Sequence, residues 1–113
     1  MNRVNELHQQ AMDLAEQAFA AKRRNDPATE RLLTYRAYHL EQEAAMLSQT
    51  EPTRSVLHRS AATLALNCGE YREAERLAAA ALAGSPPTAI ANELREVLDA
   101  VYKAWNWREQ TAA

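Results

Sequence analysis

The sequence predicts an all-α protein, and three observations carry that prediction. Glycine and proline are scarce, with 2 and 4 residues in a chain of 113. Hydrophobic residues make up 47% of the chain, and most of them are alanine or leucine, which favour helices. They recur at steps of three and four, the spacing that places side chains on one face of a helix. A chain of this length forms one core, so we expect a single helical domain over residues 1–113.

The first two helices are expected over residues 3–24 and 27–48. The first has an apolar stripe of Val4, Leu7, Ala11, Leu14, Ala18 and Ala21, broadened by Met12, Ala15 and Phe19. The second has a stripe of Leu33, Ala37, Leu40, Ala44 and Leu47, with Tyr35, Tyr38 and Met46 beside it. Between them, Asp26 can accept hydrogen bonds from the next first turn, and Pro27 fits its first position. So short a break predicts an antiparallel pair.

Two shorter helices are expected over residues 52–67 and 70–83. Their apolar faces are formed by Val56, Leu57, Ala61, Leu64, Ala65 and Cys68, and by Tyr71, Ala74, Ala78, Ala81 and Leu82. Gly69 permits a positive φ and so a tight reversal between the two helices. Gly84 is expected to end the second of them in a left-handed conformation, before Pro86 and Pro87. Ala74 and Ala81 are expected to be buried at helix–helix contacts.

Residues 55–88 resemble a tetratricopeptide repeat, a helix–turn–helix unit of about 34 residues. The resemblance rests on Gly69, Tyr71, Ala74, Ala78, Ala81 and Pro86, which stand at the offsets of the second half of that pattern. The departures are Ala78 itself, where an aromatic residue is usual, and His58, Ala61 and Ala65 in the first half. The resemblance implies tetratricopeptide-like antiparallel hairpins in a right-handed superhelical stack.

The remaining helices fit around that hairpin. Residues 1–50 resemble a diverged repeat, or equally the helical hairpin of microtubule-interacting-and-transport domains; we adopt the diverged repeat. A fifth helix is expected over residues 87–108, where Ile90, Leu94, Val97, Leu98, Val101 and Trp105 face inward. A helical array needs a terminal helix with one polar face, and the fifth helix fits that role.

Charge and cysteine content exclude several classes of protein. The net charge of −2 gives no bulk attraction to nucleic acid or to an anionic membrane. The single cysteine excludes an internal disulfide framework and suits a reducing compartment. No signal peptide and no apolar segment long enough to span a membrane is evident. The cytoplasm is the expected location.

The patterns of catalysis and metal binding are absent from the sequence. His8, His39 and His58 fall on three different helices without the spacing of metal ligands. Cys68 has no second cysteine near it, which favours a buried apolar role over a nucleophilic one. Neighbouring acids such as Glu41 and Glu43 are expected on solvated helix faces. We therefore expect no enzymatic activity, no metal and no cofactor.

The expected function is binding. Tetratricopeptide modules bind peptides in a groove lined by the first helix of each repeat, and the resemblance implies that Val56, Arg59, Thr63, Leu66 and Asn67 line it here. Trp105 and Trp107 are two residues apart on one helix, so at least one is expected at the surface as a contact residue. The sequence predicts a non-catalytic adaptor that binds another protein or a second copy of itself. The alternative is an accessory or regulatory subunit that binds a small ligand or nucleic acid through its Arg and Lys residues.

Overall fold

Five helices, each antiparallel to the one before it, make up the part of the chain whose backbone the structure describes, residues 2–112. The computed structural model describes side chains for residues 2–106. The helices are α1 (Arg3–Arg23), α2 (Pro27–Leu47), α3 (Thr53–Asn67), α4 (Tyr71–Leu82) and α5 (Thr88–Ala112). The all-α prediction is confirmed, and the expected bounds are within one residue except at the end of α5, which continues past Arg108 to Ala112.

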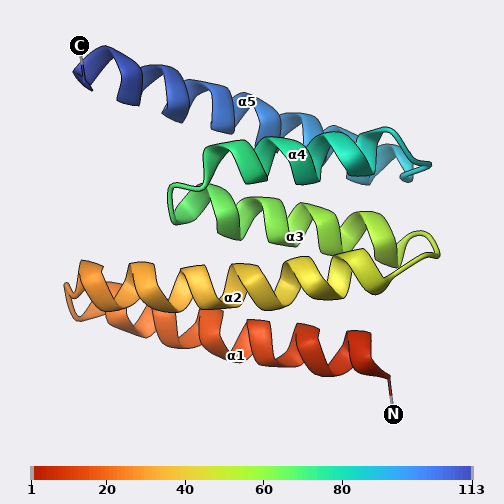
Figure 1. Ribbon diagram of the computed structural model, residues 1–113, viewed down its shortest axis with the longest axis horizontal. Coiled ribbons are helices and arrows are strands. Elements are labelled where there is room, and N and C mark those ends of the chain that lie inside the picture. The colour runs from red at the N-terminus through yellow and green to blue at the C-terminus, as the bar shows by residue number, and fades with distance from the viewer. Residues whose placement is uncertain (1, 113) are drawn as a thin grey trace.

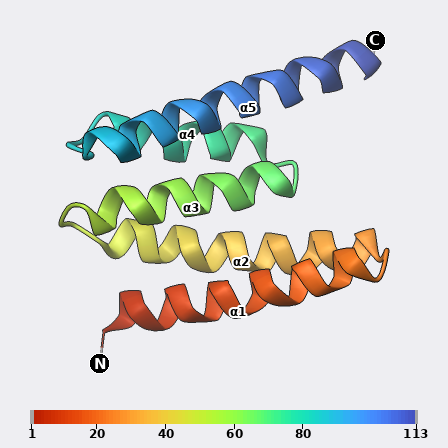
Figure 2. The same ribbon diagram turned by 180° about the vertical axis from the view of Figure 1, so that it is seen from behind.

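The helices stack in the order in which they follow one another in the sequence (Figure 1). Each helix packs against the next one, and α5 also contacts α3. In Figure 1, α2 and α4 lie nearer the viewer, whereas the opposite view of Figure 2 brings α1 and α5 to the front. The interior helices α2 and α3 are therefore covered on two sides.

Alanine is the commonest of the buried apolar residues that the structure describes. Fully buried alanines occur on α1, α2, α3 and α4, for example Ala11, Ala37, Ala61 and Ala74, each 0% exposed. A side chain this small lets neighbouring helix backbones approach closely, while larger residues such as Leu94 fill the wider spaces. The alanine-rich stripes therefore lie where the helices touch.

The buried residues form two clusters along the stack. The larger joins Tyr38 of α2 to residues of α3, α4 and α5, among them Leu77 and Val101. Burial raises the pKa of the Tyr38 hydroxyl to about 12, with a further contribution from nearby Glu73. The smaller cluster contains Leu7 of α1, Ala44 and Ala45 of α2, and Leu57 of α3.

Each of the two hairpin turns contains a residue in the left-handed region. Gly69 has φ +86° between α3 and α4, as expected, and Asn25 has φ +58° between α1 and α2. The expectation for Gly84 is wrong, because Gly69 is the glycine with a positive φ. An added Cβ at position 84 would lie 2.6 Å from Nη1 of Arg54, so a larger residue there would displace that guanidinium. Nη2 of the same guanidinium donates to the carbonyl of Ala80 near the end of α4 (3.3 Å).

Four large side chains expected in or beside the apolar stripes of the first hairpin are exposed instead. Phe19 is 56% exposed, Tyr35 41%, Met46 69% and Leu47 48%. Because α1 and α2 have 21 residues each whereas α3 has 15, the tip that carries Phe19 extends beyond its neighbour. Leu47 is the last residue of α2 and lies at the end of the first hairpin where α1 begins.

We predict that Ala74→Leu destabilises the protein by about 1–3 kcal/mol, because added bulk at a fully buried helix contact causes overpacking. Ala79→Leu is the matched control, since Ala79 is exposed on the same helix. It should change the free energy of unfolding by less than about 0.5 kcal/mol. Urea denaturation measures both, and equal effects at the two positions would contradict the packing of α4.

We also predict that Gly69→Val destabilises the folded protein more than Gly69→Asn does. A β-branched residue is strained at φ +86°, where the left-handed conformation costs about 1–2 kcal/mol for ordinary residues. Asparagine tolerates this region and should recover much of that loss. Thermal unfolding measures the midpoint of each variant. Equal midpoints would contradict a conformational role for Gly69.

Candidate functional site

Two adjacent depressions lie where the tip of the α1–α2 hairpin passes the turn between α3 and α4. One has a volume of about 420 Å³, with Pro27, Arg31, Leu66 and Gly69 among its lining residues. The other has a volume of about 410 Å³, with Phe19, Lys22, Thr34 and Leu64 among them. Glu30 and Asn67 line both depressions. The two therefore form one surface feature, which we name the hairpin-tip cleft.

Local sequence explains why α2 starts at the edge of this cleft. The carboxylate of Asp26 accepts a hydrogen bond from the backbone N–H of Thr29 (3.2 Å), and Pro27 occupies the first turn. Hydrogen bonds from Thr29 also lower the pKa of Asp26, so the cap is ionised at neutral pH. A helix that begins here places Glu30 and Arg31 within its first turns, beside the end of α3.

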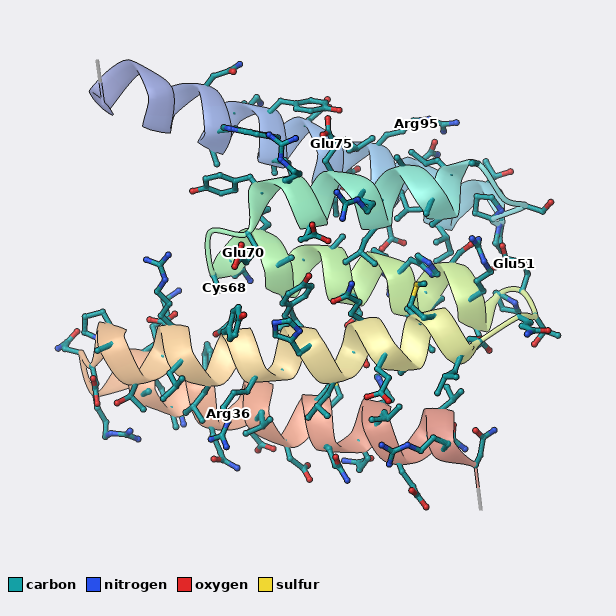
Figure 3. The ribbon with its side chains drawn as sticks, in the orientation of Figure 1. Arg36, Glu51, Cys68, Glu70, Glu75 and Arg95 are labelled. Carbon is teal, nitrogen blue, oxygen red and sulfur yellow. The ribbon has the colours of Figure 1, made fainter. Side chains whose placement is uncertain are left out.

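The turn between α3 and α4 forms the other wall of the cleft. The backbone N–H of Gly69 donates to the carbonyl of Leu66 (3.1 Å), and that of Glu70 donates to Ala65 (2.8 Å). These bonds end α3 at Asn67 and leave the Asn67 side chain exposed at the junction of the two depressions. Figure 3 shows Cys68 and Glu70 side by side at this turn.

Arg31 and Asn67 are hydrogen-bond donors of the cleft, beside Lys22. Within residues 2–106, the side chains of both make no hydrogen bond and no ion pair. Nη2 of Arg31 lies 3.1 Å from the position that a Cβ on Gly69 would take, so the guanidinium extends across the turn. An arginine offers planar donors suited to carboxylate and carbonyl oxygens. The cleft thus presents donors that no group within the described chain uses.

Cys68 also lines the cleft, with its thiol buried. The side chain is 4% exposed, and Sγ–H donates to the carbonyl of Ala65 (3.5 Å). Burial raises the pKa of the thiol, which therefore stays protonated at neutral pH. The expected burial of Cys68 is confirmed.

Two of the binding residues predicted on α3 line the hairpin-tip cleft. Leu66 and Asn67 line the hairpin-tip cleft, whereas Val56 lies near the other end of α3, in a separate pocket. Nη1 of Arg59 lies 2.6 Å from the Glu93 carboxylate of α5, so an ion pair accounts for its position. The hydroxyl of exposed Thr63 donates to the carbonyl of Arg59 (2.9 Å). A role for these residues in binding stays a prediction.

Trp105 is half-buried against the start of α4. Its ring centroid is 6.3 Å from that of Tyr71, and the guanidinium of Arg72 lies 5.6 Å above the Trp105 ring. Tyr71 also lines the hairpin-tip cleft, so Trp105 lies beside a residue of the cleft but does not line it. The side chain of Trp107 lies outside the residues whose side chains are described.

The least expected feature of the molecule is a pairing between His8 of α1 and Glu41 of α2. Glu41 is 0% exposed, and its two carboxylate oxygens lie 2.9 and 3.0 Å from Nδ1 of His8. The prediction that Glu41 lies on a solvated face is therefore wrong. Glu41 belongs to a second stripe of buried residues on α2, whose members recur at steps of three and four in the sequence. The members of that stripe are Thr34, Tyr38, Glu41, Ala45 and Ser48.

His58 differs from the other histidines. It is 3% exposed, and its Nδ1 lies 2.7 Å from the carbonyl of Arg54, one turn earlier. Burial lowers the pKa of its imidazole, so the ring is neutral at neutral pH and donates from Nδ1. Within residues 2–106, no three His, Cys, Asp or Glu side chains lie together as a metal site would require. No helix in the described part of the chain is both long and apolar enough to cross a membrane.

We predict that His8→Ala destabilises the protein by about 1–3 kcal/mol, the cost of leaving a buried acceptor without its donor. Glu41→Leu removes the buried acceptor itself, so the same histidine change should cost much less in that background. Urea denaturation of the two single variants and the double variant measures the coupling between the residues. Strictly additive effects would show that the pair contributes no interaction of its own.

Comparison of the chain with protein-family models, with curated proteins and with solved structures finds no match. The resemblance to tetratricopeptide repeats therefore rests on the motif residues and on the order of the helices, and it enters below as part of a proposal.

Proposed function

We propose that this protein is a non-catalytic, tetratricopeptide-like module that binds another protein through the hairpin-tip cleft. The observation that carries the proposal is the pair of donors on Arg31 and Asn67, which have no partner among the described residues and which line one cleft. Support for the repeat comes from two antiparallel hairpins in sequence, each with a left-handed residue in its turn.

The chemistry of the cleft suits a polypeptide segment. A guanidinium and a carboxamide can both donate to backbone carbonyls, and the carboxamide can also accept from backbone N–H groups. Leu64, Leu66 and Phe19 supply apolar surface beside these polar groups. Such a mixture of apolar surface and a few placed donors is typical of sites that bind by shape and hydrogen bonding. A protonated, buried thiol adds no chemistry to it.

A protein is a better partner than a nucleic acid for this surface. Lys22, Arg23 and Arg24 lie at the same tip, but Arg23 covers the ring of Phe19 at 4.9 Å. Asp26 and Glu30 interrupt the positive charge along the edge. Affinity for nucleic acid depends on several phosphate contacts along a track of cations, and the acids here break such a track. The free thiol of Cys68 favours a reducing compartment, so we place the interaction in the cytoplasm.

Affinity capture from the native host with the tagged chain identifies the partner, which should be a protein recovered in fixed ratio. Titration calorimetry with that partner then compares three chains: the original, Arg31→Glu and Arg36→Glu. Arg36 is the matched control, because it is exposed on α2 but points away from α3 and α4 (Figure 3).

We predict that Arg31→Glu weakens binding at least about tenfold, since hydrogen bonds to charged groups contribute about 1.5–3 kcal/mol. Arg36→Glu should leave the dissociation constant within about twofold, because exposed charges away from an interface contribute little. Equal losses at both positions would contradict the cleft as the binding site. Recovery of nucleic acid in place of a protein would contradict the proposed class of partner.

A further inference from the structure

A second pocket lies between α1 and α3, at the opposite end of α3 from the hairpin-tip cleft. It has a volume of about 210 Å³, and its walls are largely apolar, with Val4, Pro52, Val56 and Leu57 among the lining residues. His8 also lines this pocket, which we name the α1–α3 pocket. The polar group that matters here is the imidazole of His8, because its other side meets the buried carboxylate of Glu41.

Glu41 restricts the protonation pattern of that imidazole. A carboxylate that is ionised only accepts hydrogen bonds, and a ring nitrogen bonded to it then carries the proton. The distances of 2.9 and 3.0 Å to the two oxygens are nearly equal, as one N–H shared between both oxygens requires. A neutral imidazole protonated at Nδ1 has an unprotonated Nε2, which is a hydrogen-bond acceptor.

Nε2 of His8 is accessible from solvent and has no partner within residues 2–106. In that part of the chain, the one buried side-chain nitrogen or oxygen without a hydrogen bond is Nη1 of Arg54. The His8 side chain is 41% exposed while Glu41 is 0% exposed, so the open edge of the ring is the one opposite Glu41. His8 is among the residues that line the α1–α3 pocket.

We propose that Glu41 is a positioning residue that holds His8 in the Nδ1–H form, with Nε2 as a fixed acceptor at the rim of the α1–α3 pocket. The pocket then takes an aliphatic side chain of the partner segment, and Nε2 accepts a hydrogen bond from a backbone N–H beside that side chain. The identity of the occupant rests on the proposed function.

The position of the pocket supports an extended polypeptide as its occupant. Residues of α1 and of α3 line both the pocket and the depression of the hairpin-tip cleft that contains Phe19. From Val56 to Asn67 the α3 backbone rises about 16 Å, at about 1.5 Å per residue. An extended chain covers that distance in about five residues. One short segment can therefore reach both sites.

Nitrogen-15 NMR of the histidine rings tests the positioning role without any partner. The measurement is made at about pH 8.5, above the ordinary titration range of histidine. We expect His8 to show a proton on Nδ1 and none on Nε2, and we expect Glu41→Leu to remove that preference. His39, exposed and without a carboxylate partner, is the control in the same spectra. A proton on Nε2 of His8 in the original chain would overturn the proposal, whether or not Nδ1 also carries one.

Two small amides test the pocket itself. N-methyl-3-methylbutanamide combines an aliphatic group with one N–H, and its N,N-dimethyl analogue lacks the N–H. The first amide should bind at least about threefold more tightly than the second. NMR chemical shifts of Nε2 of His8 and of the Val56 methyl groups measure the binding of each amide. Glu41→Leu should abolish the difference between the two amides.

Equal affinities in the original chain, or no saturable binding by either amide, would overturn the assignment of the pocket. These measurements use no partner protein, whereas the Arg31→Glu titration uses no property of His8. Failure of the pocket and failure of the hairpin-tip cleft are therefore distinguishable.

Discussion

Close contact between neighbouring helices is the constraint on which the rest of this structure depends. The interior helix α2 packs against two partners at once and α3 against three, and alanine permits the short distances that this requires. Ala37 and Ala45 on α2, and Ala61 and Ala62 on α3, are completely or almost completely buried. Such contacts leave little spare volume, so a side chain on an interior helix faces a neighbour unless it points to one of the two broad faces of the stack.

Two-sided burial explains why a carboxylate lies inside the protein. Glu41 follows Tyr38 by three residues on the side of α2 that meets α3, and no solvent reaches that position. A buried acid is costly unless a donor meets it, and His8 of α1 supplies that donor from the edge of the stack. The same arrangement leaves the other edge of the imidazole exposed. The need of the buried Glu41 carboxylate for a donor thus fixes how the His8 imidazole is oriented at the surface.

Unequal helix lengths explain the hairpin-tip cleft. Because α1 and α2 are longer than α3 and α4, the first hairpin extends past the turn at Gly69. The C-terminal part of α5 also extends past this turn, on the other side (Figures 1 and 2). The turn of the shorter hairpin therefore lies at the base of a recess. Arg31 and Asn67 meet there because one begins a long helix and the other ends a short one.

Local patterns in the sequence predicted the local features of the fold well. The alanine steps on α4 predicted the buried positions Ala74 and Ala81, and Gly69 predicted the left-handed turn, because both depend on residues close together in the chain. The role of Gly84 was not predictable in this way, since it depends on Arg54, which is 30 residues earlier.

The site was harder to predict because its residues come from different helices. Leu66 and Asn67 were expected to bind a partner and do line the cleft, but Arg31 and Lys22 carry no motif and become neighbours only through the stacking. Likewise, His8 and Glu41 are 33 positions apart in the sequence, which hid their pairing. A single apolar stripe was assigned to α2, where an interior helix needs two. The second stripe contains Glu41.

Hydrogen exchange of the chain with and without its captured partner tests most directly whether the hairpin-tip cleft is the binding site. Turn amides and those of a helix's first turn have weak protection in the free protein, so an occupant of the cleft should slow their exchange measurably. We expect slower exchange in residues 27–31 and 66–71, and little change in the polar face of α5 around residues 92–103. Slower exchange confined to α4 and α5, with residues 27–31 and 66–71 unchanged, would contradict the account.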